Sequence, residues 1–292
     1  MNNSSYDLAI AYRIYPKVSK TPIVFTDNKY KLAELCLSSF RKCLGNLKFK
    51  MWVLLDACPP EYKDLFRKYF ASKDLEFIEL NGIGDGGTLG LQLKILSEQN
   101  LSEIVYLAED DYFYLDTAFE KMINFLQENE DVDFVSPYDH LDYYITDLHA
   151  HKYKIKIFGN KHWRTANSTC HTFITTRSNL IDTKNIFNKY AMGSLDSSNW
   201  LSLTKAKIFN PLEIYKFYLK KDNEWLFEFV KRAWIYNWNQ ILFGKKWNLW
   251  VPIPSIATHL EKVCLAPTIN WEIVIQKEIE EIEAKLSNLN RS

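Results

Sequence analysis

Segments with the hydrophobic patterns of strands and helices alternate through the first 140 residues. Short apolar runs of strand type are followed by longer segments whose apolar residues recur at helical spacing. The predicted strands are 8–12, 51–55, 75–80, 104–108 and 133–136, and the predicted helices are 28–44, one ending near 69, one ending near 100, and 117–128. Asp27 and Thr117 are the expected N-caps of the first and last of these helices. Such alternation predicts an α/β fold, a mainly parallel sheet with helices on both faces.

The pattern changes after about residue 140. Polar, histidine-rich and aromatic-rich sequence follows, with one clear strand at 171–176 and an amphipathic helix over the last twenty residues. We therefore expect three parts: an α/β half over 1–140, a second half of the same domain over 141–270 with an aromatic-rich helical segment, and the C-terminal helix over 271–292. The default for that helix is packing on its own domain, with a contact in a homo-oligomer as the alternative.

Charge and cysteine content narrow the classes of function. Lys plus Arg and Asp plus Glu each total 36, so the formal net charge is zero and no basic field favours nucleic acid. The 5 cysteines lack the spacing of zinc or redox motifs, which predicts reduced thiols. The first residues lack the basic start and apolar run of a secretory signal. We expect a cytoplasmic protein.

Three consecutive acids, Glu109, Asp110 and Asp111, follow the apolar run 104–108. Ligand sites in α/β sheets form just beyond the carboxyl ends of strands. Three adjacent carboxylates repel one another unless a cation relieves the repulsion. Mg²⁺ and Mn²⁺ are typically held by one or two carboxylates together with substrate phosphates. The motif is therefore a candidate for a cation that neutralises a departing diphosphate.

The glycine-rich turn at 82–87 allows a different interpretation. Its letters match G-x-G-x-x-G, it lies between a predicted strand and a helix, and Glu109 follows about twenty residues later, as in NAD-dependent oxidoreductases. However, two strand–helix units precede this turn, whereas the fingerprint usually lies in the first. Gly86 and Gly87 are candidates for a close backbone approach to a nucleotide.

The segment Leu107-Ala-Glu-Asp-Asp-Tyr-Phe-Tyr114 resembles the D-x-D motif of glycosyltransferases of the GT-A fold, and the order of the preceding elements is similar to their nucleotide-binding half. The resemblance covers roughly residues 6–200, with His259 as a match outside that range. It implies that residues 1–140 bind a nucleotide-sugar and that residues 141–270 bind the acceptor. The site residues that it implies are Asp111, Glu109 and His259 as ligands of Mn²⁺ or Mg²⁺, and Tyr12, Arg13, Asp56, Gly86, Gly87 and Asp110 as contacts to the nucleotide.

The second half supplies a candidate catalytic base. Asp196 begins a predicted helix and lies four positions before Trp200, a loose match to the segment that carries the base in inverting members of that family. A carboxylate there could accept the proton of an acceptor hydroxyl. Asp222 and Glu224 are the alternatives, and Arg164 or Lys161 is expected to face the donor phosphates.

Residues 225–250 carry many aromatic side chains among Lys231, Arg232, Lys245 and Lys246. Packing in a core is the first expectation for most of them. Stacking on an acceptor sugar and peripheral contact with the inner face of a membrane are the alternatives, since Trp and Lys favour a lipid interface. No apolar stretch approaches the roughly 20 residues that span a bilayer.

These observations predict a metal-dependent hexosyltransferase-type glycosyltransferase, inverting, with Asp196 as base and a glycan or lipid-linked glycan as acceptor in polysaccharide biosynthesis. Three other interpretations stay open. A nucleotidyltransferase making nucleotide-sugars would share the sheet, although residues 12–16 lack the glycine-rich basic loop of that class. An NAD-dependent oxidoreductase would use the turn Gly82–Gly87. A non-enzymatic glycan-binding protein would use the aromatic tract.

Overall fold

One sheet of nine strands organises the part of the chain that the computed structural model describes, residues 5–18, 20–209, 215, 219 and 224–289. The strand order is β3 (Leu75–Leu80), β2 (Phe49–Asp56), β1 (Leu8–Ile14), β4 (Ile104–Ala108), β9 (Phe173–Thr176), β6 (Phe134–Val135), β10 (Leu249–Ile253), β8 (Lys161–Ala166) and β7 (Ile155–Phe158). Strand β9 runs antiparallel to β4 and β6, and β8 runs antiparallel to β10 and β7. The remaining pairings are parallel. The predicted mainly parallel α/β sheet is confirmed.

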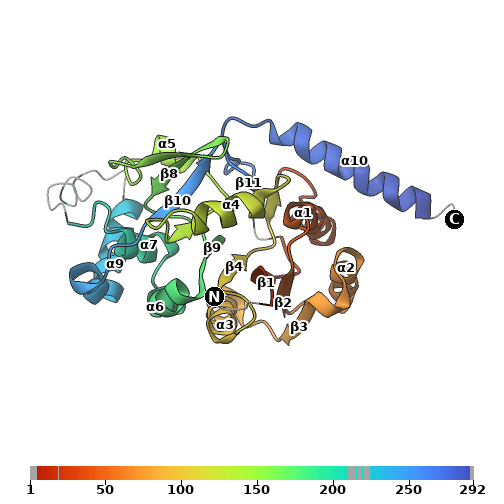
Figure 1. Cartoon of the computed structure of the whole chain (residues 1–292), viewed down its shortest axis with the longest axis horizontal. Coiled ribbons are helices and arrows are strands. Elements are labelled where there is room, and N and C mark those ends of the chain that lie inside the picture. The colour runs from red at the N-terminus through yellow and green to blue at the C-terminus, as the bar shows by residue number, and fades with distance from the viewer. Residues whose placement is uncertain (1–4, 19, 210–214, 216–218, 220–223, 290–292) are drawn as a thin grey trace.

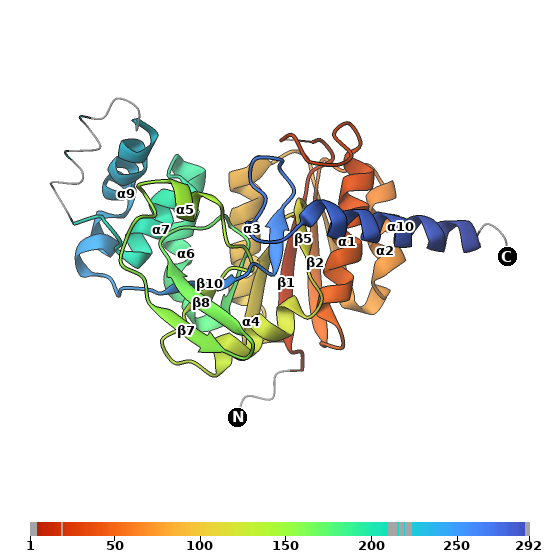
Figure 2. The same cartoon turned by 90° about the horizontal axis from the view of Figure 1, so that it is seen from above.

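Helices cover both faces of the sheet, as Figures 1 and 2 show. Helices α1 (Lys29–Leu44), α2 (Glu61–Tyr69) and α4 (Ala118–Gln127) pack into the core on one face. On the other face lie α3 (Gly84–Glu98), α6 (Arg177–Phe187) and α7 (Asp196–Thr204). A strand covered on both faces reads as a continuous apolar run, which explains why the central strands were predictable.

Strand β1 shows how the alternation of side chains divides the two cores. Leu8, Ile10 and Tyr12 join the core beneath α1, whereas Ala9 and Ala11 join the core beneath α3. Successive side chains of a strand point to opposite faces. Arg13, the next residue, therefore faces the side of α3, where a site can form.

Segments from the second half complete the same sheet. Strand β9 lies between β4 and β6, and β10 lies beside β6. Strands from before and after residue 140 therefore alternate in this part of the sheet. A small antiparallel pair is made by β5 (Tyr112–Tyr114) and β11 (Ala257–His259). The other short elements are η1 (Ser72–Asp74), α5 (Asp142–Ile145) and η2 (Asn188–Met192).

The C-terminal helix α10 (Trp271–Leu289) packs its first turns on α1. Trp271 and Ile275 are buried in the core of that face, and Lys42 of α1 pairs with Glu278. The distal end of α10 extends beyond the body of the molecule (Figure 1). Packing on its own domain is thus observed for this helix, and its role in a homo-oligomer stays a prediction.

Helix α9 (Glu224–Phe243) packs against α7 and carries part of the aromatic tract. Beyond it, Trp247 and Trp250 are buried as core residues, but Trp238 is 49% exposed. The tract is therefore mixed and does not form a single buried cluster. Among the described helices, none combines the length and the apolar character needed to cross a bilayer.

Two predicted caps are wrong. Asn28, rather than Asp27, caps α1 by accepting a hydrogen bond from the N–H of Lys31. Thr117 precedes α4 with a positive φ of 61° and makes no side-chain hydrogen bond to the helix. In both cases the apolar pattern predicted the helix correctly. The residue that caps it depends on the conformation of the preceding loop, which the pattern does not determine.

Candidate active site

A cavity of about 650 Å³ opens where β1, β2 and β4 end. Parallel strands bring their carboxyl ends to one edge of a sheet, so loops distant in sequence meet there. The lining includes Arg13, Tyr15, Asp56, Gly84, Asp85 and Glu109–Asp111 from the first half, and Tyr138, His140, Cys170, His171, Tyr190, Asp196, His259, Glu261 and Cys264 from the second. The acidic motif, Asp56, Asp196 and His259 are thus brought to one cavity.

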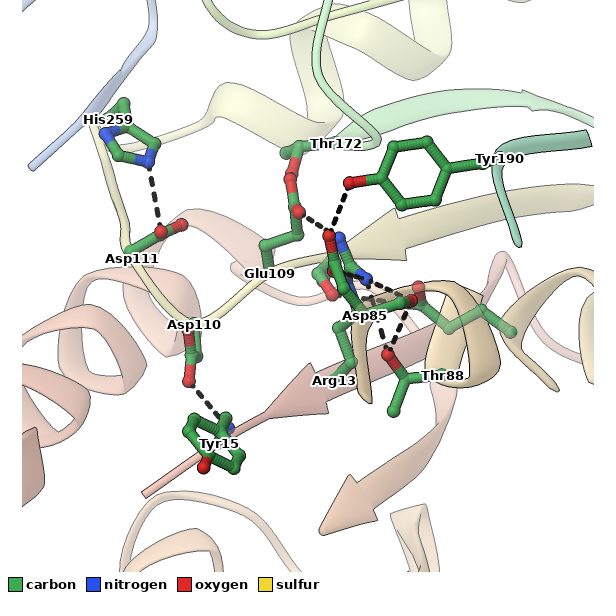
Figure 3. Close-up of polar contacts among 12 residues, drawn as sticks. Arg13, Tyr15, Asp85, Thr88, Glu109, Asp110, Asp111, Thr172, Tyr190 and His259 are labelled. Atoms are coloured by element: carbon green, nitrogen blue, oxygen red, sulfur yellow. Dashed lines mark hydrogen bonds and ion pairs between the residues drawn. The ribbon is translucent and has the colours of Figure 1, made fainter. Parts of the chain in front are cut away.

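The three carboxylates of the acidic motif point to three different sets of partners (Figure 3). Glu109 pairs with the buried guanidinium of Arg13 and accepts a hydrogen bond of 2.7 Å from the hydroxyl of Thr172. Arg13 also pairs with Asp85 of α3. These bonds occupy both oxygens of Glu109. Glu109 therefore positions Arg13, and the geometry does not support its predicted role as a metal ligand.

Asp110 holds the loop after β1 against the motif. Its carboxylate accepts a hydrogen bond from the backbone N–H of Tyr15 at 2.9 Å, and Lys29 Nζ lies 2.9 Å from its other oxygen. Burial raises the pKa of Asp110, and the charge of Lys29 acts in the opposite direction. Asp110 therefore forms part of the wall of the cavity. Its contact with a nucleotide stays a prediction.

Asp111 has the carboxylate best suited to a cation. Its Oδ2 lies 3.0 Å from Nε2 of His259, and its buried Oδ1 has no hydrogen-bond partner in the part of the chain that the structure describes. Burial alone would raise the pKa of Asp111, but the charge and hydrogen bond of His259 outweigh it and lower the pKa to about 2. An ionised carboxylate with an unsatisfied buried oxygen is costly unless a cation or water supplies a partner.

Asp111 and His259 fit a divalent ion. Two ligand atoms bonded at about 2.1 Å and at right angles to one ion lie about 3.0 Å apart, which is the separation seen here between oxygen and nitrogen. Burial lowers the pKa of His259 and Asp111 raises it, with a net increase. An ion at this position would therefore compete with a proton on His259.

Asp56 is committed to the glycine-rich turn. It is 2% exposed, and its two oxygens accept hydrogen bonds from the N–H groups of Ile83 at 2.8 Å and Gly84 at 2.9 Å. These N–H groups open α3, where a dinucleotide-binding protein would place the pyrophosphate. Because a carboxylate already fills this position, the geometry opposes the oxidoreductase interpretation.

Gly86 and Gly87 serve packing instead of lining the cavity. A Cβ on Gly86 would lie 3.0 Å from the backbone of Ala191 in η2, and one on Gly87 would lie 3.1 Å from the side chain of Ile83. Gly82 and Gly84, which have positive φ, are the glycines at the cavity. Gly86 and Gly87 therefore allow close packing of α3, and not the predicted close approach of the backbone to a nucleotide.

Asp196 is the first residue of α7 and lines the cavity. It is partly exposed, and its Oδ1 accepts a hydrogen bond of 2.6 Å from the N–H of Ser197. His171, 3% exposed, has an Nε2 atom with no partner among the described residues. Burial lowers the pKa of His171, with a smaller opposing effect from Asp196.

Several expected contacts are corrected by the geometry. The ring of Tyr12 lies in the core between Phe40 and Phe66, with centroid distances of 5.4 and 5.3 Å, because residue 12 faces away from the cavity. Arg164 is buried against Asp139 at 2.7 Å, and Lys161 donates to the carbonyl of Pro254 at 3.0 Å. Neither basic residue lines the cavity. Asp222 and the side chain of Glu224 fall outside the described residues.

Sequence reasoning missed several residues that line the cavity or hold its wall. Tyr190 of η2 donates a hydrogen bond of 2.6 Å to Asp85, which joins the second half to α3. Asp85 stood inside the glycine-rich turn and could have been noticed. The others, Tyr138, Cys170, Glu261 and Cys264, follow no motif that would have marked them.

No family model matches the sequence, and no curated protein matches it. Solved structures resemble the fold at low identity. A 4-diphosphocytidyl-2C-methyl-D-erythritol synthase from Anaerococcus prevotii has a TM-score of 0.42 and 12% identity over 70% of this chain and 84% of that one. The galactosyltransferase LgtC, solved with donor and acceptor sugar analogues, has a TM-score of 0.40 and 10% identity over 77% and 83% of the two chains.

A third similar structure is glucosyl-3-phosphoglycerate synthase from Mycobacterium tuberculosis, solved with Mg²⁺ and uridine diphosphate. Its TM-score is 0.37 with 9% identity, covering 61% of this chain and 58% of that one.

Proposed function

We propose that this chain is a metal-dependent glycosyltransferase of the GT-A type, which moves a sugar from a nucleoside-diphosphate sugar to a hydroxyl acceptor. One observation supports the proposal: the carboxylate of Asp111, whose buried Oδ1 has no hydrogen-bond partner among the described residues, lies beside His259 in the cavity where β1, β2 and β4 end. Such a pair suits a cation, and the acidic cavity needs one before a diphosphate can enter.

The order of the strands suggests how a donor would lie. Asp56 is the last residue of β2 and Glu109 follows β4, while His171 precedes β9 and Asp196 lies beyond it. We place the nucleoside near Asp56 and Gly84, the diphosphate at Asp111, and the sugar toward Asp196. A bound divalent ion would neutralise the charge that develops on the departing diphosphate. Asp111 and His259 would hold it, with Mn²⁺ and Mg²⁺ as the first candidates.

Asp196 is the proposed base, with inversion at the anomeric carbon. Its carboxylate would accept the proton of the acceptor hydroxyl while that oxygen bonds to the anomeric carbon. The bond from that carbon to the diphosphate oxygen breaks in the same step, and the electron pair leaves with the diphosphate.

Binding measurements with nucleotides test the proposal. A thermal-shift screen of UDP-, GDP-, CMP- and dTDP-sugars, each with and without Mn²⁺, should find at least one donor that stabilises the chain only with the metal. A ligand at a hundred times its dissociation constant contributes about 2.7 kcal/mol. If no nucleotide binds in a metal-dependent way, the proposal fails. Product analysis then separates sugar transfer from the synthesis of nucleotide-sugars out of a nucleoside triphosphate and a sugar phosphate.

We further propose that this enzyme meets its acceptor at an anionic lipid surface, which suits a lipid-linked glycan. Ile235, Trp238, Leu242 and Phe243 of α9 are 58%, 49%, 47% and 79% exposed. Lys231 and Lys246 are exposed nearby in sequence and supply the complementary charge. Sedimentation with vesicles containing phosphatidylglycerol should recover the wild type, and Trp238→Ala with Phe243→Ala should abolish recovery. Equal binding of this double variant would refute the contact.

A further inference from the structure

Three different kinds of metal ligand gather just after β11. A ring nitrogen of His259, a carboxylate oxygen of Glu261 and the Sγ of Cys264 all lie within 4.8 Å of one another. All three residues line the cavity that contains the acidic motif. A thiol, an imidazole and a carboxylate together form a donor set that a metal ion can use, whereas a purely acidic cluster would be ordinary.

The backbone holds this segment against the acidic motif. The N–H of Leu260 donates to the carbonyl of Asp111 at 2.9 Å, and the N–H of Cys264 donates to the carbonyl of Glu261 at 2.9 Å. The first bond fixes the segment beside Asp111, and the second closes the turn that brings Cys264 back toward His259. The three ligands are therefore positioned before any ion binds, which lowers the cost of ordering them.

Hydrogen bonds join the three residues of this segment to one another, one between side chains and one from the backbone. The thiol of Cys264 lies 3.5 Å from Glu261 Oε2, and the N–H of Glu261 donates to Nδ1 of His259 at 3.1 Å. The same ring reaches Asp111 Oδ2 through Nε2. Because Nδ1 already accepts the N–H of Glu261, an ion would take the place of the proton that Nε2 shares with Asp111.

We infer that Glu261 and Cys264 belong, with His259 and Asp111, to the cation site of this chain, and that the site takes an ion that accepts sulfur, such as Zn²⁺ or Co²⁺, in preference to Mg²⁺. Thiolate ligands select Zn²⁺ and related ions, whereas Mg²⁺ demands oxygen. On binding, the thiol releases its proton to solvent as the sulfur–metal bond forms. This inference rests on the proposed function, because it names the ion that would face the diphosphate.

Cobalt spectroscopy on the full chain provides the test. After chelation and addition of Co²⁺, the wild type should show the near-ultraviolet charge-transfer band of a cobalt–thiolate bond. Cys264→Ser should lose the band, and its affinity for Zn²⁺ should fall at least about tenfold, a loss seen even for residues that only support a ligand. Cys170→Ser is the matched control, since Cys170 also lines the cavity, and it should keep both.

The outcomes are separable. Absence of the band in the wild type, or its persistence in Cys264→Ser, overturns the inference. Nucleotide binding that still requires Mg²⁺ or Mn²⁺ would then leave the proposed function standing. A cobalt–thiolate band without metal-dependent binding of any nucleotide would support the site and refute the transferase. Cys264→Ala provides a second variant if the serine variant proves unstable, with circular dichroism as the check on folding.

Discussion

The Nε2 atom of His259 lies 3.0 Å from Oδ2 of Asp111, although 148 positions separate the two residues. The contact forms because β11, which ends at His259, pairs with β5, which begins one residue after Asp111. The antiparallel register places His259 opposite Tyr112. A two-stranded sheet outside the main one therefore completes the candidate cation site.

Asp111→Asn should abolish metal-dependent binding of nucleotides. The amide keeps the shape of the side chain but removes the charge that holds a divalent ion. Isothermal titration with Mn²⁺ and the best nucleotide should show at least a roughly hundredfold loss of affinity, since the chelating carboxylate is the first ligand of the ion. Asp64→Asn, at an exposed position of α2, is the control and should bind like the wild type. Metal-dependent binding retained by Asp111→Asn would contradict the assignment.

Asp196→Asn should lower kcat and leave the binding of the donor intact. A general base contributes about 10²–10⁴-fold to the rate, and an amide cannot accept the proton. Steady-state kinetics with the donor and acceptor identified by screening would measure this loss, and titration of the donor would measure the affinity. A rise of KM at constant kcat would show that Asp196 binds substrate without acting as the base.

Arg13→Met should destabilise the fold. The side chain of Arg13 is 9% exposed and pairs with Glu109 and Asp85, and breaking a buried ion pair on one side costs about 3–5 kcal/mol. Urea unfolding measures this loss. Arg67→Met is the matched control, because Arg67 pairs with Asp64 at an exposed position, and the expected cost is about 1 kcal/mol or less. Equal losses for both variants would refute a structural role for the Arg13 pairs.

We expect the free energy of unfolding to fall at acid pH because His149 is buried in its neutral form. This residue is 6% exposed and hydrogen-bonded to Asn167, and burial lowers its pKa to about 4. The unfolded chain takes up the proton near pH 6.5, so this contribution to stability is complete above that pH and is lost as the pH falls toward 4. The loss amounts to roughly 3 kcal/mol.

Urea unfolding of His149→Asn between pH 7 and 4 tests this linkage. The asparagine can keep a hydrogen bond to Asn167 without titrating, so the fall in unfolding free energy across this range should be smaller than in the wild type. His162→Asn, at an exposed site, should leave the pH profile unchanged. A wild-type profile in His149→Asn would refute the assignment.

The sequence predicted the helices and strands whose patterns depend on residues close together in the chain. Apolar runs of four to eight residues and helical periodicity arise from contacts with one core, so they marked β1 to β4 and their helices. The acids after β4 were visible because ligands gather where strands end. Tyr12 and Arg13 show what the sequence could not predict. Alternation along a strand puts their side chains on opposite faces of the sheet, but the sequence does not say which of the two faces borders the cavity.

By itself, the sequence determined that this chain builds a mainly parallel α/β sheet and that three acids stand at the end of its fourth strand. Only the tertiary structure decided what each acid does: Glu109 pairs with Arg13, Asp110 with Lys29, and Asp111 lies beside His259. Strand patterns depend on neighbours a few residues away. The partner of a carboxylate depends on which distant loops the packed sheet brings to one edge.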